Sequence, residues 1–337
     1  MSAEEAEDLV GLAYRMALGR EPRARELAHF AALLAEGEID ARGLLTRIER
    51  SQEYGVRTSV APAHPPGHYY SPVVDPSELG RPLVPDRAAR IDGLAGLSIR
   101  QADLEAWFDG LLAHVGALRF AEGRGGATRY FADNPIFPLG DAVILDAVIG
   151  RLRPARIVEI GSGLSTAAML DAVEHRDLAT RVTAVEPYPD RLLSVTSEAD
   201  RAGPLELLEA RVQEVPLSRF EALGAGDILF IDSSHVLKTG SDVCFELFEI
   251  LPRLARGVHV HFHDIGYPFE YPDGWVFDRR YSWNEVYAVR AFLSFNEAWT
   301  VRAYNACPWP GKRAALEARY GAPIANPGGG LWIERTG

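Results

Sequence analysis

From Arg156 onward, short runs of β-branched and aliphatic residues alternate with longer stretches of helical periodicity. Each helical stretch is long enough to carry the chain back to a parallel neighbouring strand. This alternation predicts an α/β fold, a doubly wound and mostly parallel sheet with helices on both faces. The expected strands are RIVEIG, RVTAVEP, LELLEA, DILFID and GVHVHFHDI, at residues 156–161, 181–187, 205–210, 227–232 and 257–265.

Two further strands are expected near the C-terminus, at residues 300–306 and 330–337. No helix is expected between them, so the end of the chain should form an antiparallel edge of the sheet. Upstream of the alternation, apolar residues at helical spacing predict helices over residues 101–118 and 141–151. Together these elements predict a catalytic domain over residues 101–337.

Residues 1–57 have a different pattern, with apolar positions at the i, i+3, i+4 spacing of amphipathic helices. They predict a small bundle of three helices. The stretch from LGREPRAR to Ser51-Gln52-Glu53-Tyr54 resembles phycobilisome-linker repeats. This resemblance makes the N-terminal module a candidate for binding a protein partner.

Residues 58–100 form a proline-rich connector, because seven prolines fall between residues 61 and 85. Such a stretch can be neither a helix nor a central strand. An extended linker is the simpler interpretation. The alternative is a lid over a site, because aromatic side chains such as Tyr69 and Tyr70 seldom occur in a free tether.

Charge and cysteine content limit the function classes. With 47 acidic and 35 basic residues the net charge is −12, which disfavours nucleic acid and anionic membrane surfaces as partners. Two cysteines are too few for a disulfide framework. The N-terminus is acidic where a signal peptide would be basic, and no apolar run reaches the length of a membrane span. A cytoplasmic protein is therefore expected.

The first predicted strand leads into a turn with two glycines, in the sequence Glu159-Ile160-Gly161-Ser162-Gly163-Leu164-Ser165-Thr166. Such glycines let the backbone approach a ligand at the N-terminus of the next helix. Thr166 stands where a dinucleotide fingerprint has its third glycine. Glu186, at the end of the second strand, can accept both ribose hydroxyls of an adenosine. A plain strand–helix turn explains either feature alone, but together they predict a nucleotide site.

With Asp232 at the end of DILFID, these residues resemble the class I S-adenosylmethionine-dependent methyltransferases, over about residues 125–337. The resemblance implies a Rossmann-like, seven-stranded sheet whose last strand runs antiparallel, with S-adenosylmethionine as cofactor. The passages FIDSSHVLKTGSDV and HVHFHDIGYPFEYP are similar to a bacterial O-methyltransferase subgroup, some of whose members act on sugars. The cofactor-binding residues that the resemblance implies are Glu159, Gly161, Ser162, Gly163, Ser165, Thr166, Glu186 and Asp232.

Asp232 and His235 are the candidate catalytic residues, with His263 on the neighbouring strand beside them. They follow strands whose carboxyl ends should face the crevice where open α/β sheets bind ligands. A hydroxyl acceptor must lose its proton, and an imidazole titrates near neutrality, so His235 is a candidate general base. The alternative is that His235 only caps the following turn.

Three histidines alternate along the last parallel strand and point to one face. Of these, His259 and His261 are expected in the core with satisfied ring nitrogens. The resemblance also gives a Mg²⁺-ligand role to Asp232 and Asp264. However, the residue before Asp264 is a histidine and the residue after it is Ile265, both poor ligands for this ion. The sequence therefore favours an enzyme without a metal.

Aromatic residues outside the strands supply candidates for acceptor contact. Tyr267 and Trp275, together with Tyr69 and Tyr70, are predicted to contact a sugar, a glycan or another hydroxylated small molecule. The pair Asn284-Glu285 is expected to begin a helix and not to touch substrate.

Two other functions remain open at this point. A nicotinamide-dependent oxidoreductase also uses a glycine turn, although Thr166 and the late position of the turn disfavour it. The second function is that of a non-catalytic protein, which retains cofactor affinity and recruits partners through its N-terminal helices. The oligomeric state is open as well, including a homo-oligomer.

Overall fold

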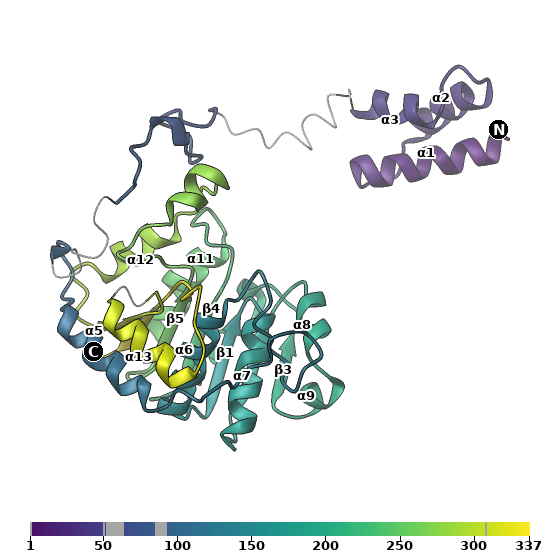
Figure 1. Cartoon of the computed structure of the whole chain (residues 1–337). Helices are drawn as coiled ribbons and strands as arrows, with labels where there is room; N and C mark the ends of the chain where they lie inside the picture. The colour runs from purple at the N-terminus through teal and green to yellow at the C-terminus, as the bar shows by residue number, and fades with distance from the viewer. Residues whose placement is uncertain (1, 50, 52–63, 85–92, 307–308) are drawn as a thin grey trace. The chain divides into compact units, whose positions relative to one another are not determined.

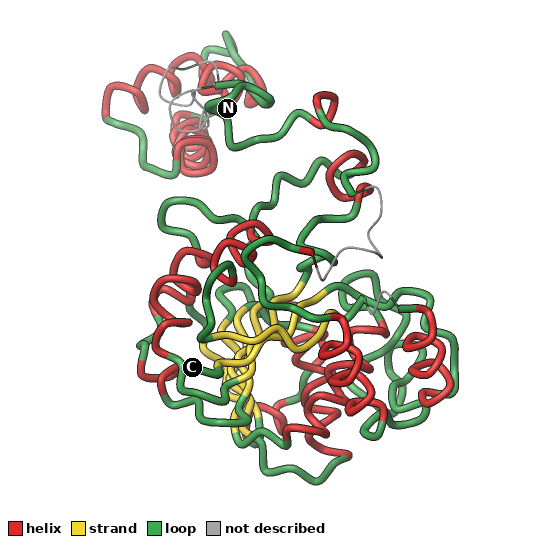
Figure 2. The backbone as a smooth tube through the Cα atoms, turned by 90° about the vertical axis from the view of Figure 1, so that its left-hand side faces the viewer, coloured by secondary structure: helices red, strands yellow, loops and turns green. Residues whose placement is uncertain are grey.

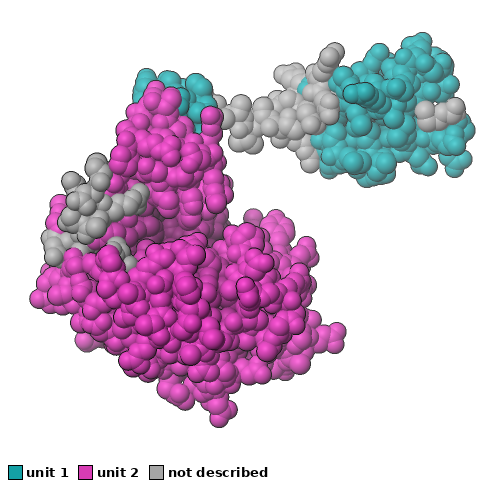
Figure 3. All heavy atoms as spheres, in the orientation of Figure 1, with its two compact units in different colours: residues 1–75 teal, residues 76–337 magenta. Residues whose placement is uncertain are grey.

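The computed structural model describes residues 2–49, 51, 64–84, 93–306 and 309–337. The chain divides into two compact units, Met1–Asp75 and Pro76–Gly337 (Figure 3). The domain boundaries predicted after residues 57 and 100 stay predictions.

The first unit contains the three predicted helices. The first of them begins with a capping box, in which the Ser2 hydroxyl accepts from the Glu5 N–H at 3.2 Å and the Glu5 carboxylate accepts from the Ser2 N–H at 2.8 Å. Apolar side chains from all three helices, including Val10, Leu34 and Leu44, meet in one small core. The helices are α1 (Ala3–Leu18), α2 (Ala24–Ala35) and α3 (Ala41–Glu49).

The second unit is built on a seven-stranded sheet of order β3-β2-β1-β4-β5-β7-β6 (Figures 1 and 2). The first five strands pair in parallel, whereas β7 is antiparallel to both β5 and β6. The predicted doubly wound sheet with an antiparallel edge is confirmed. The strands are β1 (Arg156–Ile160), β2 (Arg181–Val185), β3 (Leu205–Leu208), β4 (Ile228–Ile231), β5 (His259–His263), β6 (Trp299–Tyr304) and β7 (Gly330–Arg335).

Helices cover both faces of this sheet (Figure 2). Successive strand residues alternate between two cores, so that Ile157 packs with the α6 and α7 side while Val158 packs with the α11 and α12 side. The helices are α5 (Gln101–Leu112), α6 (Leu139–Leu152), α7 (Leu164–His175), α8 (Asp190–Val195), α9 (Glu198–Ala202), α10 (Ser218–Glu221), α11 (Asp242–Phe245), α12 (Glu285–Leu293) and α13 (Pro310–Tyr320). Short 3₁₀ or π turns are η1 (Pro76–Glu78), η3 (Val212–Glu214), η4 (Glu246–Ile250), η5 (Leu251–Arg253) and η6 (Gly274–Asp278).

Two predictions for the helices need correction. No helix was expected between the last two strands, but α13 lies there. It begins with Pro310 in its first turn and buries only Leu316 and Tyr320, so its apolar pattern is weak. The helix predicted over residues 101–118 ends at Leu112, and the chain then turns, with Leu118 in a left-handed conformation (φ 45°).

Residues 64–84 of the connector hold no regular element except η1. The C-terminal end of this stretch belongs to the second unit and packs beside η6. The Leu83 N–H donates to the Asp273 carboxylate at 3.2 Å, and the Arg81 guanidinium lies 5.0 Å from the centre of the Phe277 ring. No helix within the described residues is long and apolar enough to cross a membrane.

Candidate active site

The turn between β1 and α7 brings the ends of three strands together. Gly161 has a φ of +79°, and a Cβ at this position would lie 1.9 Å from the carbonyl oxygen of Asp232, just after β4. The Gly161 N–H donates to the carbonyl of Val185, the last residue of β2, at 3.0 Å. Only glycine combines the left-handed backbone with so close an approach. The carboxyl ends of β1, β2 and β4 therefore meet at this turn.

Glu159, Ser165 and Thr166 form a buried network behind the same turn. The hydroxyls of Ser165 and Thr166 donate to the two carboxylate oxygens of Glu159, and the Thr166 hydroxyl also accepts from the Gly163 N–H at 3.1 Å. Burial raises the pKa of Glu159 to about 8. None of the three side chains lines the cavity beside the turn. At the position where a dinucleotide fingerprint has its third glycine, Thr166 thus stabilises the loop through side-chain hydrogen bonds.

A cavity of about 520 Å³ opens in front of the turn. The N–H groups of Ser162 and Tyr188 donate to the two carboxylate oxygens of Glu186, at 3.0 and 2.8 Å, and so fix this side chain at the cavity wall. Among the described residues, the buried Ser162 hydroxyl has no hydrogen-bond partner. A bound nucleoside can use the free lone pairs of Glu186.

Two other hollows of similar volume, about 530 and 540 Å³, lie beside Arg129 and beside Phe295. Neither is lined by the carboxyl end of a parallel strand, where open α/β sheets bind their ligands. The cavity at Gly161 and Glu186 is therefore the candidate ligand site.

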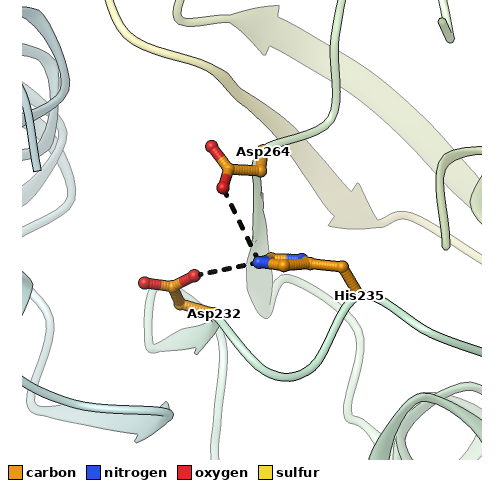
Figure 4. Close-up of side chains that lie close together, drawn as sticks. All are labelled: Asp232, His235 and Asp264. Atoms are coloured by element: carbon orange, nitrogen blue, oxygen red, sulfur yellow. Dashed lines mark ion pairs between the residues drawn. The ribbon is translucent and has the colours of Figure 1, made fainter. Parts of the chain in front are cut away.

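Asp232, His235 and Asp264 meet next to this cavity, which Asp232 also lines (Figure 4). Because β4 and β5 are parallel neighbours, the residues that follow them, Asp232 and Asp264, lie at the same edge of the sheet. Nε2 of His235 is 3.5 Å from Asp232 Oδ1 and 3.6 Å from Asp264 Oδ2. One potential ligand atom from each of the three residues lies within 4.8 Å of the others, so together they could hold a metal ion.

A third carboxylate reaches the same imidazole from the other side. Nδ1 of His235 is 2.9 Å from Oε2 of Glu285, the first residue of α12. Burial lowers the pKa of His235, but its interactions with Asp232 and Glu285 outweigh burial and raise the pKa well above its ordinary value. The pKa of Asp264 is raised by burial. The surrounding carboxylates therefore make His235 a stronger base than a free imidazole.

Comparison with known proteins identifies the family. Residues 158–265 match the family described as "Methyltransferase domain". A protein of Archaeoglobus fulgidus, described as uncharacterized, is 30% identical over 178 residues, which cover 50% of this chain and 77% of that protein. The chain contains an S-adenosylmethionine-dependent methyltransferase domain. Its cofactor is S-adenosylmethionine, and the glycine turn and the Glu186 carboxylate at the cavity wall of this methyltransferase fit that molecule.

Solved structures with a similar arrangement include two methyltransferases. The O-methyltransferase TomG from Streptomyces achromogenes, involved in tomaymycin synthesis and solved with S-adenosylmethionine, is 18% identical, with a TM-score of 0.41, and the match covers 61% of this chain and 84% of that one. The S-adenosylhomocysteine-bound methyltransferase PaMTH1 of Podospora anserina is 14% identical, with a TM-score of 0.36, covering 71% of this chain and 89% of that one.

Glu285 is the site residue that sequence reasoning missed. Asn284-Glu285 was expected to begin a helix, and α12 does begin at Glu285. Its carboxylate, however, is buried against His235, 50 residues earlier in the chain. No local motif marks this role, because the contact depends on where α12 packs.

The three histidines of β5 point to one face, as predicted, and His259 and His261 are buried, as expected. Nδ1 of His261 has no hydrogen-bond partner among the described residues, so the prediction of satisfied nitrogens was wrong for this residue. His261 instead stacks on Phe230 at 4.2 Å between ring centres. His263, a predicted catalytic residue, is buried behind Asp264, with its Nε2 3.5 Å from Oδ1 of that aspartate.

The predicted acceptor-contacting residues have different surroundings within their own units. Tyr69 and Tyr70 are exposed on the first unit. Tyr267 is buried in the core, where its ring packs edge-on against Tyr304. Trp275 is linked to the methyltransferase site through Trp283, whose ring centre is 5.4 Å from that of Trp275 and 4.4 Å from that of His235.

Proposed function

We propose that this methyltransferase is an O-methyltransferase that acts on a hydroxyl group of a sugar, a glycan or another hydroxylated small molecule. The observation that supports this most is the position of His235. Its Nε2 lies within 3.6 Å of both Asp232 and Asp264, and Asp232 is shared with the cofactor cavity. A group that can hold a proton thus lies next to the donor site.

When bound, S-adenosylmethionine supplies an electrophilic methyl group, whose carbon–sulfur electron pair stays on sulfur as the acceptor oxygen binds the carbon. Gly161, Ser162 and Glu186 hold the cofactor at the turn after β1. The hydroxyl proton of the acceptor passes to the cluster of His235, Asp232 and Asp264. Proton removal by a positioned side chain is usually worth roughly 10²- to 10⁴-fold in rate.

Aromatic side chains beside His235 support a ring-shaped acceptor. Tyr281 stacks on Trp283 at 4.4 Å between ring centres, and Trp283 lies against the His235 imidazole. Such rings, with a few polar groups nearby, suit sugars and flat hydroxylated molecules. The net charge of −12 disfavours nucleic acid as the acceptor. A sugar hydroxyl is the first acceptor to test.

A metal-assisted form of the same reaction is the second candidate. The proximity of the Asp232 and Asp264 carboxylates supports it, because Mg²⁺ prefers carboxylate oxygens and keeps several waters. In this form the two aspartates would hold the ion, which would lower the pKa of the acceptor hydroxyl. His235 is a poor ligand for this ion and keeps its proton-accepting role.

The resemblance of residues 1–57 to phycobilisome-linker repeats, a protein partner for them, and a homo-oligomer stay predictions. A lid formed by residues 58–100 and acceptor contacts by Tyr69 and Tyr70 also stay predictions.

Calorimetry and a transfer assay test the proposal. We expect S-adenosylmethionine and S-adenosylhomocysteine to bind the wild-type chain, and the wild type to methylate at least one member of a panel of sugars and phenols. His235→Ala should bind the cofactor normally but lose transfer by roughly 10²-fold or more. His29→Ala, which removes an exposed histidine of α2, is the matched control.

Each outcome decides one part of the proposal. Absence of cofactor binding by the wild type would overturn it. Unchanged transfer by His235→Ala would remove the role of His235. Transfer that stops with EDTA and returns with Mg²⁺ would establish the metal-assisted form, and transfer unaffected by EDTA would exclude it.

A further inference from the structure

The start of α12 forms a set of backbone contacts with the loop that carries His235. The N–H groups of Asn284 and Glu285 both donate to the carbonyl oxygen of His235, at 3.1 and 3.2 Å. The side-chain amide of Asn284 also pairs with Leu237, accepting from its N–H at 2.6 Å and donating to its carbonyl at 3.2 Å. Four hydrogen bonds therefore join two segments that are 47 residues apart or more.

These bonds stabilise an unfavourable backbone conformation. His235 has a φ of +59°, in the left-handed region that residues other than glycine uncommonly adopt. The contacts from α12 stabilise this conformation, because they bind the backbone at His235 and at Leu237.

The Glu285 side chain then sets the direction of the imidazole ring. Its carboxylate, 1% exposed, can only accept a hydrogen bond, so the Nδ1–H of His235 is the donor at 2.9 Å. With Nδ1 directed at Glu285, Nε2 is the nitrogen that faces Asp232 and Asp264 (Figure 4). A flipped ring would leave a buried carboxylate without a donor, which is unfavourable.

We propose that Asn284 and Glu285 are positioning residues of this enzyme, which hold the His235 loop and direct Nε2 toward the transferred methyl group. Asn284 fixes the backbone, and Glu285 fixes the ring and the tautomer. This inference rests on the proposed function of His235. Neither residue lines the cofactor cavity, so both act through His235 alone.

Ring-nitrogen NMR of the ¹⁵N-histidine-labelled full chain tests the ring orientation without any acceptor. In the wild type we expect a strongly deshielded Nδ1 proton on His235, assigned by its disappearance in His235→Asn, a substitution that suits the left-handed backbone. Glu285→Ala should abolish this signal. Glu285→Gln, which keeps the shape and one acceptor oxygen, should keep the tautomer and shift the proton upfield.

Kinetics supply the second measurement. We expect Glu285→Ala and Asn284→Ala to lower kcat by roughly 10- to 100-fold, the usual range for residues that orient a functional side chain, with cofactor Kd within about twofold of wild type. Glu285→Gln should retain more activity than Glu285→Ala. Tyr287→Phe, which removes a surface hydrogen bond of α12 to Glu270, is the matched control.

The results separate this inference from the proposed function. A wild-type Nδ1 signal that persists in Glu285→Ala would overturn the inference, as would unchanged kcat in both variants. Should Glu285→Ala fail to fold, an Nδ1 proton in Glu285→Gln identical to that of the wild type would overturn it equally. If the wild type transfers no methyl group, the proposed function fails, while the NMR result still decides whether α12 orients His235.

Discussion

Replacing Gly161 with alanine tests whether the turn after β1 forms the cofactor site. The added Cβ would lie 1.9 Å from the carbonyl oxygen of Asp232, whereas real Cβ atoms keep at least 3.0 Å from such atoms. Either the turn or the end of β4 must therefore move by about 1 Å. The φ of +79° adds strain, because alanine rarely adopts a left-handed backbone.

The magnitude follows from these two effects. Left-handed strain alone costs about 1–2 kcal/mol. Displacement of the turn also weakens the hydrogen bond from the Ser162 N–H to the Glu186 carboxylate, and a bond to a charged group is worth about 1.5–3 kcal/mol. We expect the free energy of unfolding to fall by roughly 3–4 kcal/mol. If the displaced turn also weakens cofactor binding by about 2 kcal/mol, the Kd for S-adenosylmethionine rises by about 30-fold.

Urea unfolding and calorimetry with S-adenosylmethionine measure both quantities. Gly226→Ala is the matched control, because Gly226 also has a positive φ, +85°, but its nearest neighbour would be 3.8 Å from the new Cβ. This control should lose about 1 kcal/mol of unfolding free energy and bind the cofactor normally. If Gly161→Ala binds S-adenosylmethionine as tightly as Gly226→Ala, the reasoning about the turn is refuted.

Three further predictions concern charged groups. Burial raises the pKa of Asp200, but hydrogen bonds from Arg129 and Ser197 outweigh burial and lower the pKa to about 2. Asp200→Asn should therefore lose about 2 kcal/mol of unfolding free energy at pH 7. In urea titrations this difference from the wild type should shrink as the pH falls from about 4 to 2. Burial raises the pKa of Glu159 to about 8, so ionisation of this side chain destabilises the fold. The wild type should therefore lose stability relative to Glu159→Gln as the pH rises from about 5 to 8. Parallel curves of unfolding free energy against pH for the two proteins would contradict this. Asparagine suits the left-handed backbone at position 264 (φ 58°), so Asp264→Asn should fold normally. This variant should lower methyl transfer by about tenfold or more, with an unchanged cofactor Kd because Asp264 does not line the cavity. Normal transfer would remove Asp264 from the proton-accepting cluster.

The fold could be predicted from the sequence because its strands and helices have clear periodicities. Strands such as Ile228–Ile231 are buried on both faces, and each appears as a short apolar run before a helical stretch. The helix α13 was missed for the opposite reason, since only Leu316 and Tyr320 of its residues are buried. Its stability depends on packing, and a pattern of two apolar residues does not reveal it.

The site was predictable where topology alone decides the position of a residue. Asp232 and Asp264 follow neighbouring parallel strands, so their proximity follows from the strand order. Glu159 shows the limit of this reasoning, because its place in the glycine motif does not say whether the carboxylate faces a ligand or the loop. The structure places it against Ser165 and Thr166.

The reactive residues and the residues that orient them come from different parts of the chain. The family match ends at residue 265 and includes Asp232, His235 and Asp264. Both His235 and Asp264 have left-handed backbones that contacts from later segments stabilise, the first through the start of α12 and the second through a hydrogen bond from the Asp264 N–H to the Gly329 carbonyl at 2.8 Å. Substitutions beyond residue 265 can therefore alter the geometry of the reaction without touching a residue of the matched family segment.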